Sequence, residues 1–264
     1  GHMRAASKAA AAEMKQRLME EADAIRAEDI QISRNIGQYG FELLEKLGKG
    51  VGIMTHCNAG TLATAKYGTA LAPVYIALEN GWDGKQDLHV YCDETRPLLQ
   101  GARLSAYEMQ AAGVDTYVQC DNMASYTMKS GKIGIIFVGC DRVAANGDFA
   151  NKIGTSGVAI IAKHYGIPFY CCAPSSTIDM TMESGDEIHI EQRKGEEVTE
   201  MWYAKRMAPE GVGVVNPAFD VTDHSLVTGI ITEKGIAYPD ENGSFKSAFE
   251  RMGIKPVEKY VDKK

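Results

Sequence analysis

The segment Ile133–Cys140 consists entirely of apolar and small residues, and it ends abruptly at Asp141. A strand without charged or amide side chains on either face is typical of a parallel sheet that helices cover on both sides. A loop of small residues follows, and Asn151 and Lys152 then open a helical pattern near Gly154. The sequence therefore gathers a carboxylate, an amide and an ammonium group beyond one buried strand, where open α/β sheets bind ligands.

The same order of elements recurs along the chain. Five strand-like runs end in polar or small residues, at 52–57, 88–92, 116–120, 133–140 and 168–172. Helical stretches are expected after the first three runs, at 61–80, 99–112 and 124–129. This alternation predicts an α/β fold, a Rossmann-like, doubly wound parallel sheet with right-handed connections.

A long, charged helical segment precedes the sheet. Residues 4–36 contain neither Gly nor Pro, and Ile32, Ile36, Tyr39, Leu43 and Leu47 continue an apolar stripe. We expect an expression scar at 1–3, a helical connector at 4–49, a catalytic domain at 50–256 and a frayed tail at 257–264. A charged helix of this length suggests either that something precedes it in a longer protein or that it packs on a second subunit.

Composition narrows the possible classes of protein. The formal net charge of −7 argues against a nucleic-acid binder. No apolar run approaches the roughly 18 residues of a membrane-spanning helix, so no membrane partner is expected. The six cysteines lie in or after predicted strands and form no CxxC pair. This usage predicts a cytoplasmic protein with neither disulfides nor a zinc site.

Cys57 differs from the other cysteines because it follows a strand and precedes a predicted helix start. The partial positive charge of a helix N-terminus favours a thiolate or another anion. Cys57 is therefore either an acid/base or nucleophilic thiol, or a buried small residue. His56 points to the opposite face of the strand and is expected to be a packed or hydrogen-bonded core histidine.

Asp141 directly follows the buried run. Partial burial would raise the pKa of its carboxyl group and suit it to proton transfer near neutrality, whereas the alternative is a carboxylate that caps the next loop. Asn151 and Lys152 either cap a helix start or bind the hydroxyls or phosphate of a substrate. The sequence contains neither GxGxxG nor GxxxxGK[ST], so dinucleotide and Walker-type nucleotide binding lack support.

Seven motifs together resemble the methylthioribose-1-phosphate isomerase family. They occur in the family's order and are THCNAGTLATAKYGTALAPV (55–74), VYCDETRPLLQGARLSAYE (90–108), DNMASYTM (121–128), VGCDRVAANGDFANKIGTSG (138–157), GIPFYCCAPSSTID (166–179), NPAFDVT (216–222) and GIITEKG (229–235). The family is related to the regulatory α, β and δ subunits of translation initiation factor 2B and to ribose-1,5-bisphosphate isomerases.

The resemblance implies that Cys57 and Asp141 are catalytic and that Gln100, Asn151 and Lys152 bind the substrate. It implies a homodimeric isomerase that converts 5-methylthioribose 1-phosphate to 5-methylthioribulose 1-phosphate in methionine salvage. No cofactor is implied, and no metal is expected because these residues do not form a ligand set. Hydride transfer and an enediol intermediate are both compatible with these residues.

Two alternatives remain open. A non-catalytic subunit like those of initiation factor 2B would share the fold, and a ribose-1,5-bisphosphate isomerase would share the catalytic pair. The joint presence of the five site residues favours an enzyme, and an apolar pocket wall would favour a methylthio group over a second phosphate.

The resemblance also implies a departure from the family at the beginning of the chain. Family members usually carry an N-terminal helical domain with an Arg-Gly-Ala motif that helps hold the phosphate, and no such motif precedes residue 50. We therefore interpret the chain as a C-terminal domain or a truncated variant, and we expect its catalysis to be weak or absent. Arg96, Asn216 and Asp220 lie in family motifs, and the resemblance leaves open whether they are structural.

Overall fold

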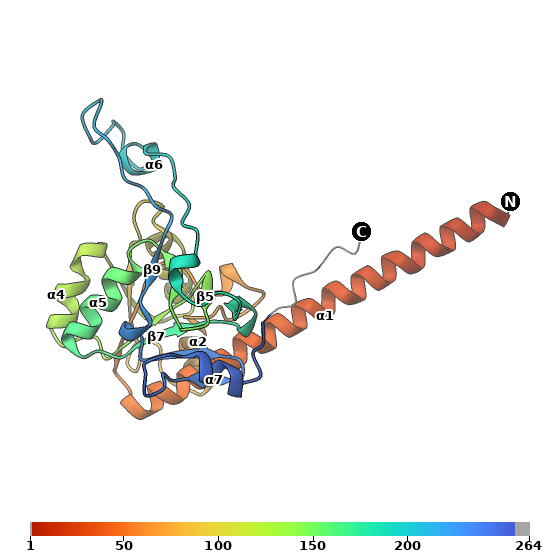
Figure 1. The fold of residues 1–264 in the computed structure, drawn as a ribbon, viewed down its shortest axis with the longest axis horizontal. Helices are drawn as coiled ribbons and strands as arrows, with labels where there is room; N and C mark the ends of the chain where they lie inside the picture. Colours follow the sequence, from red (N-terminus) through yellow and green to blue (C-terminus); the bar gives the residue numbers. More distant parts are fainter. Residues whose placement is uncertain (1, 257–264) are drawn as a thin grey trace.

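The computed structural model describes residues 2–256, with side chains from residue 11 onward. Its centre is a seven-stranded sheet in the order β11-β10-β7-β4-β1-β2-β3 (Figure 1). The strands are β1 (Gly52–Thr55), β2 (His89–Asp93), β3 (Asp115–Gln119), β4 (Ile135–Val138), β7 (Phe169–Cys172), β10 (Gly229–Thr232) and β11 (Gly235–Ala237). All neighbouring strands are parallel except β10 and β11, which are antiparallel.

The predicted doubly wound parallel sheet is confirmed. Each of the five predicted runs contains a strand, and the chain winds outward from β1 in one direction through β2 and β3, then from β4 in the other. The order therefore reverses between β1 and β4, which are hydrogen-bonded neighbours. The sequence analysis missed β10 and β11, because two short runs separated by a tight turn do not give the strand–helix alternation on which it relied.

A second, smaller sheet covers the end of the first one. The expectation that a helix starts at Asn151 and Lys152 is wrong, because both residues belong to this sheet. Its order is β8-β5-β6-β9, with β5 (Arg142–Ala144), β6 (Phe149–Lys152), β8 (Ile178–Asp179) and β9 (Phe219–Thr222). Asn151 and Lys152 end β6, and α5 begins only at Thr155. The reason is a β5–β6 hairpin, whose turn uses Gly147 at a φ of 99°.

The helices lie on both faces of the main sheet, except α6, which lies on a projecting segment (Figure 1). They are α1 (His2–Leu47), α2 (Ala72–Glu79), α3 (Ala106–Ala111), α4 (Ala124–Lys129), α5 (Thr155–Tyr165), α6 (Glu196–Thr199) and α7 (Lys246–Arg251). Short 3₁₀ turns are η1 (Thr61–Ala63), η3 (Asp121–Met123), η4 (Ser175–Thr177), η5 (Gly185–Glu187) and η6 (His224–Leu226). A π-helical turn, η2 (Gly101–Ser105), leads directly into α3.

The expectation of one helix over 61–80 is wrong in its first half. Only the 3₁₀ turn η1 forms there, and α2 starts at Ala72. Gly68 has a φ of 75°, and a Cβ at this position would collide with the backbone of Ala59 and Gly60. The chain must therefore fold back on the loop after β1 before the helix can begin.

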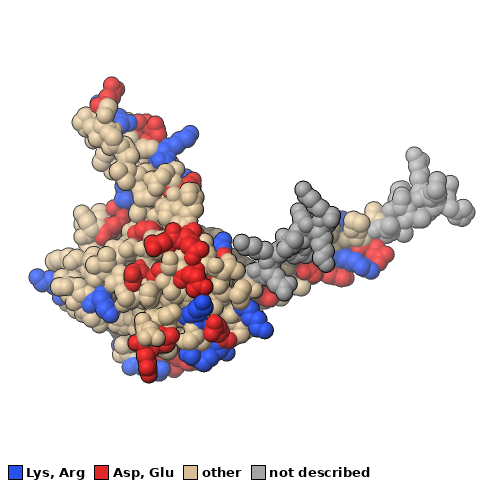
Figure 2. Space-filling model, viewed as in Figure 1, with Lys and Arg blue, Asp and Glu red and all other residues tan. Residues whose placement is uncertain are grey.

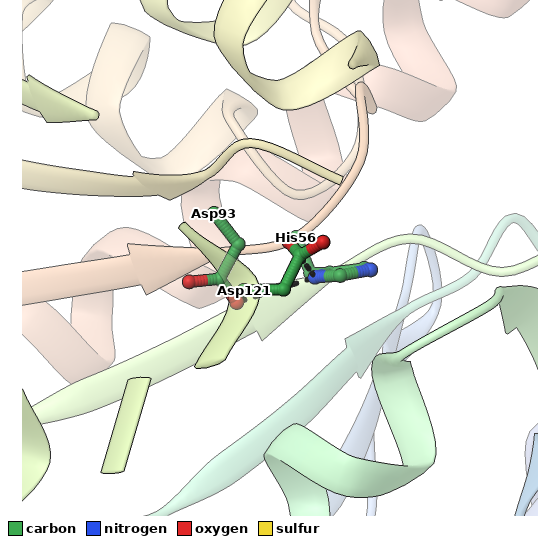
Figure 3. A group of neighbouring side chains, drawn as sticks. All are labelled: His56, Asp93 and Asp121. Atoms are coloured by element: carbon green, nitrogen blue, oxygen red, sulfur yellow. Dashed lines mark hydrogen bonds and ion pairs between the residues drawn. The ribbon is translucent and has the colours of Figure 1, made fainter. Parts of the chain in front are cut away.

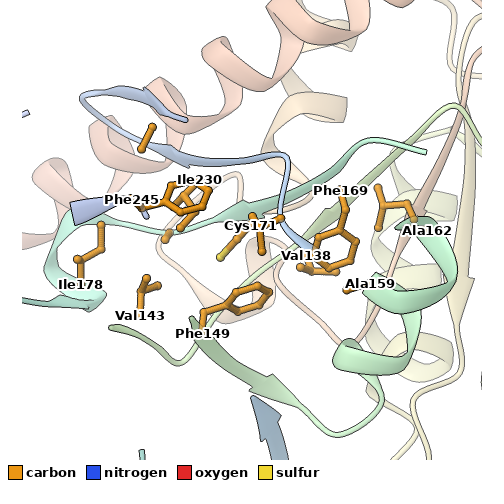
Figure 4. Packing of buried hydrophobic residues seen from close by; sticks show 14 of the residues in the cluster. Val138, Val143, Phe149, Ala159, Ala162, Phe169, Cys171, Ile178, Ile230 and Phe245 are labelled. Atoms are coloured by element: carbon orange, nitrogen blue, oxygen red, sulfur yellow. The ribbon is translucent and has the colours of Figure 1, made fainter. Parts of the chain in front are cut away.

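Alternate residues of the central strands pack into two separate cores, as expected for strands buried on both faces. Ile136 and Val138 of β4 belong to a core shared with α4, α5 and α7 and with the small sheet. Figure 4 shows Val138, Phe169 and Cys171 packed with Phe149 of the small sheet and, at the right, with Ala159 and Ala162 of α5. Ile135 and Phe137 belong to the opposite core, which α1, α2 and α3 cover.

The expected long helix before the sheet is confirmed as α1, whereas its role as a connector stays a prediction. Its last turns bury Ile36 and Leu44 against α2 and the β10–β11 edge, and its first half extends away from the body (Figure 1). Within the described residues, no helix combines the length and the apolar character that crossing a membrane requires. The expected tail at 257–264 and Gly1 of the expected scar lie outside the described residues.

Residues 190–217, between β8 and β9, project from the body as an arm that carries α6 (Figure 1). On the face drawn in Figure 2 most of the arm's side chains are uncharged. Its large apolar residues are exposed and include Met201, Trp202, Tyr203, Met207, Val212 and Val215. The base of the arm contacts the segment after β2, because Arg96 donates to the Val198 carbonyl at 2.7 Å and Trp202 donates to the Pro97 carbonyl at 2.6 Å.

Candidate active site

Four of the five predicted site residues line one pocket at the point where the strand order reverses. Cys57 follows β1 by two residues, and Asp141 follows the neighbouring β4 by three. Asn151 and Lys152 reach the same pocket from the end of β6, and its volume is about 470 Å³. A crevice at the carboxyl ends of strands, at such a reversal, is the usual ligand site of a doubly wound sheet.

The backbone at Cys57 is held in an unusual conformation. Its φ is 68°, in the left-handed region that residues other than glycine rarely adopt. The Cys57 N–H donates to Thr95 Oγ1 at 2.8 Å, and the Cys57 carbonyl accepts from Ser105 Oγ at 2.7 Å. Thr95 itself has a φ of 64°, so two strained residues at the ends of β1 and β2 are joined by a hydrogen bond.

Burial raises the pKa of the Cys57 thiol to about 11. The Asn58 N–H and the Lys152 ammonium act in the opposite direction, and the Asp141 carboxylate adds to the rise. The thiolate that a helix start was expected to favour is therefore wrong, because Gly60 and the 3₁₀ turn η1 follow in place of an α-helix N-terminus. Cys57 carries its proton at neutral pH.

The pKa of Asp141 is raised as predicted. Burial by the surrounding protein is the main cause, and the Lys152 ammonium opposes it. The residue as a whole is exposed because the pocket is open, but its neighbours still shield the carboxyl group from much of the solvent. Asp141 is therefore easier to protonate near neutrality than an ordinary aspartate.

Asn151 and Lys152 differ in their surroundings although they are consecutive. Asn151 is buried, and its amide donates to Thr155 Oγ1 at 3.0 Å. The ammonium nitrogen of Lys152 lies 4.0 Å from the centre of the Phe219 ring, which also lines the pocket. Lys152 thus supplies a positive charge close to both Cys57 and Asp141, since it lowers the pKa of each.

Gln100 is the one predicted site residue that does not line this pocket. It is half-buried at the start of the π-helical turn η2, whose last residue, Ser105, contacts Cys57. Its Oε1 atom is buried, and no described residue gives it a hydrogen bond. Its predicted contact with a substrate remains a prediction.

His56 is a buried, hydrogen-bonded histidine, as predicted. Its Nε2 lies 2.8 Å from the Ile153 carbonyl, and its Nδ1 lies 3.2 Å from an oxygen of Asp93 (Figure 3). Burial lowers the pKa of His56, but the hydrogen bond and charge of Asp93, together with the Ile153 carbonyl and the charge of Asp121, raise it overall. Because Ile153 follows Lys152, His56 ties the strand that carries Cys57 to the strand that carries Lys152.

His56, Asp93 and Asp121 are close enough to hold a metal ion, but their donors are already engaged (Figure 3). The second ring nitrogen of His56 faces a carbonyl, and Gln119 donates to Asp93 at 2.7 Å. Asp121 accepts the backbone N–H groups of residues 95 and 96. The group therefore serves as a hydrogen-bond network between loops rather than as a ligand set.

The three residues whose role the resemblance left open make structural contacts. Asp220 accepts from the N–H groups of Gly154, at 2.9 Å, and Ser156, at 3.2 Å, and so caps the start of α5. Asn216 donates to the Lys194 carbonyl at 2.8 Å, within the arm. Arg96 holds the base of the arm, as described above.

The sequence analysis missed Asp29 of α1, which lines the pocket and accepts from the Ala65 N–H at 2.7 Å. It also missed Glu108, whose buried carboxylate accepts from the loop after Cys57. Asp29 gave no signal because it lies far from the other site residues in the sequence. Ser105 and Glu108, three residues apart, form a helical pair of polar residues that could have been noticed.

A family model described as "Initiation factor 2 subunit family" matches residues 2–239. Among curated relatives, the methylthioribose-1-phosphate isomerase of Symbiobacterium thermophilum is 63% identical over 90% of this chain and 65% of its own length. That of Parabacteroides distasonis is 60% identical over 86% of this chain and 65% of its own. The 5-deoxyribose 1-phosphate isomerase of Petrotoga mobilis is 54% identical over 90% of this chain and 66% of its own length. The chain thus spans about 65% of the length of the first relatives it matches.

Two solved structures share the fold. The 5-methylthioribose 1-phosphate isomerase from Pyrococcus horikoshii OT3 has a TM-score of 0.82 and 43% identity, over 91% of this chain and 64% of that chain. Subunit delta of the translation initiation factor eIF-2B from A. fulgidus has a TM-score of 0.82 and 38% identity, over 90% of this chain and 67% of that chain. Overall shape therefore does not separate an isomerase from a translation-factor subunit.

Proposed function

The chain belongs to the initiation factor 2 subunit family, and from this premise we propose that it is an aldose–ketose isomerase of a 5-substituted ribose 1-phosphate. The single observation that carries the proposal is the pocket in which Cys57, Asp141 and Lys152 meet. The names of the relatives indicate 5-methylthioribose 1-phosphate or 5-deoxyribose 1-phosphate as the substrate. Six free cysteines fit the reducing cytoplasm, where methionine salvage would take place.

The chemistry of this reaction needs a group that first gives and then takes back one proton. Opening of the sugar ring places a proton on the ring oxygen, the hydrogen on C2 is then transferred to C1, and formation of the ketone removes a proton from the C2 hydroxyl. Asp141 suits this exchange because burial raises its pKa, which makes it a better proton donor and acceptor than an ordinary aspartate. Cys57 would act as a neutral thiol that relays a proton, and Lys152 would hold the phosphate.

The wall of the pocket favours a substrate with one phosphate. Lys152 is the only basic residue among the described residues that line it, and Asp29 and Asp141 are acidic. Several of the other lining residues are small or apolar: Ala59, Ala63, Gly139, Pro174 and Phe219. A second phosphate would meet two carboxylates, whereas a methylthio or methyl group would meet carbon atoms. This supports a 5-methylthio or 5-deoxy sugar over ribose 1,5-bisphosphate.

Single-turnover conversion tests the proposal even if catalysis is slow. The chain is mixed in excess with 5-methylthioribose 1-phosphate, 5-deoxyribose 1-phosphate or ribose 1,5-bisphosphate, and the ketose 1-phosphate is followed by phosphorus NMR. We expect conversion of the first two. Neither binding nor conversion of any of the three would contradict the proposal and favour a regulatory subunit.

Variants test the roles of the two reacting groups. Cys57→Ser and Asp141→Asn should each slow conversion by about 10²–10⁴-fold without unfolding the protein, because a positioned acid/base supplies that much rate. Cys120→Ser is the matched control, since Cys120 is exposed and does not line the pocket. Near-normal conversion by either pocket variant would contradict its assigned role.

A further inference from the structure

The loop after Cys57 is fastened to one buried carboxylate. Glu108 of α3 is only 5% exposed. Its oxygens accept from Asn58 Nδ2 at 2.9 Å, from the Thr61 hydroxyl at 2.8 Å and from the Leu62 N–H at 3.1 Å, and also from the Thr61 N–H. Tyr75 of α2 donates to the same group at 3.3 Å. A carboxylate with this many donors fixes the path of the chain immediately after Cys57.

A short chain of contacts leads from Glu108 to the Cys57 peptide. Asn58 Nδ2 also lies 3.3 Å from Ser105 Oγ, which in turn donates to the Cys57 carbonyl. Ser105 and Glu108 lie three residues apart, where the π-helical turn η2 passes into α3, so they reach the loop together. Gly60 packs so closely on Glu108 that a Cβ there would collide with the carboxylate.

These contacts stabilise an unfavourable backbone conformation, the left-handed turn at Cys57. A cysteine at a φ of 68° keeps that conformation only where its surroundings impose it. Thr95 holds its N–H and Ser105 holds its carbonyl, while Glu108 secures the residues that follow. We propose that Glu108 is a positioning residue, which keeps Cys57 in its left-handed turn and its thiol partly buried at the pocket wall.

This inference rests on the proposed function only in treating Cys57 as a reacting thiol. Its physical readout is the reactivity of that thiol, which needs no substrate. The charged groups near Cys57 are Asp141 after β4 and Lys152 of β6, and neither contacts Glu108. A change at Glu108 therefore reaches the thiol through the loop and not through a direct charge.

Alkylation of Cys57 by iodoacetamide, followed by mass spectrometry of its peptide as a function of pH, tests the proposal. Only the thiolate reacts, so burial slows the wild type at neutral pH. In Glu108→Gln the amide cannot accept all of these donors, so the loop should loosen and water should enter. The pKa of Cys57 should then move from about 11 towards the ordinary 9.0, which accelerates alkylation by up to about 100-fold at fixed pH.

Asp87→Asn is the matched control, because Asp87 is also a partly buried carboxylate that accepts a backbone N–H, that of Asp83, but it lies just before β2, at the opposite end of the strands from Cys57. It should leave the alkylation of Cys57 unchanged. Ser105→Ala removes one hydrogen bond to the Cys57 carbonyl and should accelerate alkylation less than Glu108→Gln does; it keeps the test valid if Glu108→Gln does not fold. Unchanged alkylation of Cys57 in a folded Glu108→Gln, or in Ser105→Ala if the former is unfolded, would overturn the proposal. A shift in alkylation without conversion of any sugar phosphate by the wild type would uphold it and reject the proposed function.

Discussion

Burial raises the pKa values of both Cys57 and Asp141, and the nearby Lys152 ammonium lowers both pKa values. The rise at Asp141 could be predicted because the residue directly follows an apolar strand. The rise at Cys57 could not, because the sequence analysis placed a helix start behind it. Burial by residues distant in the sequence causes this rise, and the sequence next to Cys57 does not show it.

Lys152→Met should weaken the binding of a sugar 1-phosphate by roughly 10–150-fold, because one charge-assisted contact stabilises a complex by about 1.5–3 kcal/mol. Isothermal titration calorimetry would measure the loss. Lys163→Met is the control, since Lys163 lines a different pocket. Equal weakening by both variants would show that Lys152 acts only through the general charge of the protein.

Asp141→Asn should stabilise the fold near neutrality. The folded pKa of Asp141 lies above its ordinary 3.8, so ionisation disfavours the folded state. The favourable contribution of the protonated group is complete below the unfolded pKa and is lost as pH rises through the folded pKa. Urea unfolding near neutral pH should therefore show a gain in the free energy of unfolding that shrinks as the pH is lowered towards the ordinary pKa of 3.8. A gain that stays constant with pH would contradict this assignment.

Among the structural elements, the sequence predicted the repeated strands of the main sheet but not the second sheet. The five parallel strands follow from apolar runs, and their order brings the ends of β1 and β4 together. The second sheet was not predicted, because β5, β6, β8 and β9 contain only two to four residues each. The prediction nevertheless put Lys152 at the site. Whether it starts a helix or ends a strand, Lys152 lies beyond the carboxyl end of β4.

Gly154→Ala should destabilise the protein. Gly154 has a φ of 104°, and a Cβ there would lie 2.8 Å from the ring of His56. Adopting the left-handed region costs a residue other than glycine about 1–2 kcal/mol, and the contact with His56 adds to this cost. Thermal unfolding would show a lower midpoint.

Gly157→Ala, three residues further along in α5, supplies the control for that experiment. A Cβ at Gly157 meets no atom within 4 Å, and alanine favours a helix over glycine by about 0.5–1 kcal/mol. It should raise the midpoint. A lower midpoint in both variants would indicate that α5 tolerates no substitution and that His56 is not the cause.

At the scale of the whole molecule, two projecting parts carry apolar residues without cover in the described chain. The first half of α1 exposes Met14, Leu18 and Ile25, and the arm exposes Trp202 and Val215. Projecting apolar surface of this kind commonly marks a contact with another chain. We therefore predict that these surfaces take part in the homodimer that the resemblance implies.

Light scattering coupled to gel filtration should therefore give twice the mass of one chain. The measurement should be repeated over a range of concentrations, because dissociation of a weak dimer depends on them. The mass of a single chain at every concentration tested would contradict the dimer.

The burial of Cys57 should protect its thiol from oxidation. Peroxides attack thiolates, and the ladder from sulfenic to sulfonic acid starts only where a thiolate is accessible. A thiol that keeps its proton up to about pH 11 presents very little thiolate to an oxidant at neutral pH. A cysteine held in this way can remain at a reacting centre in an aerobic cell without a resolving partner. Electrophilic inhibitors aimed at it would react slowly for the same reason.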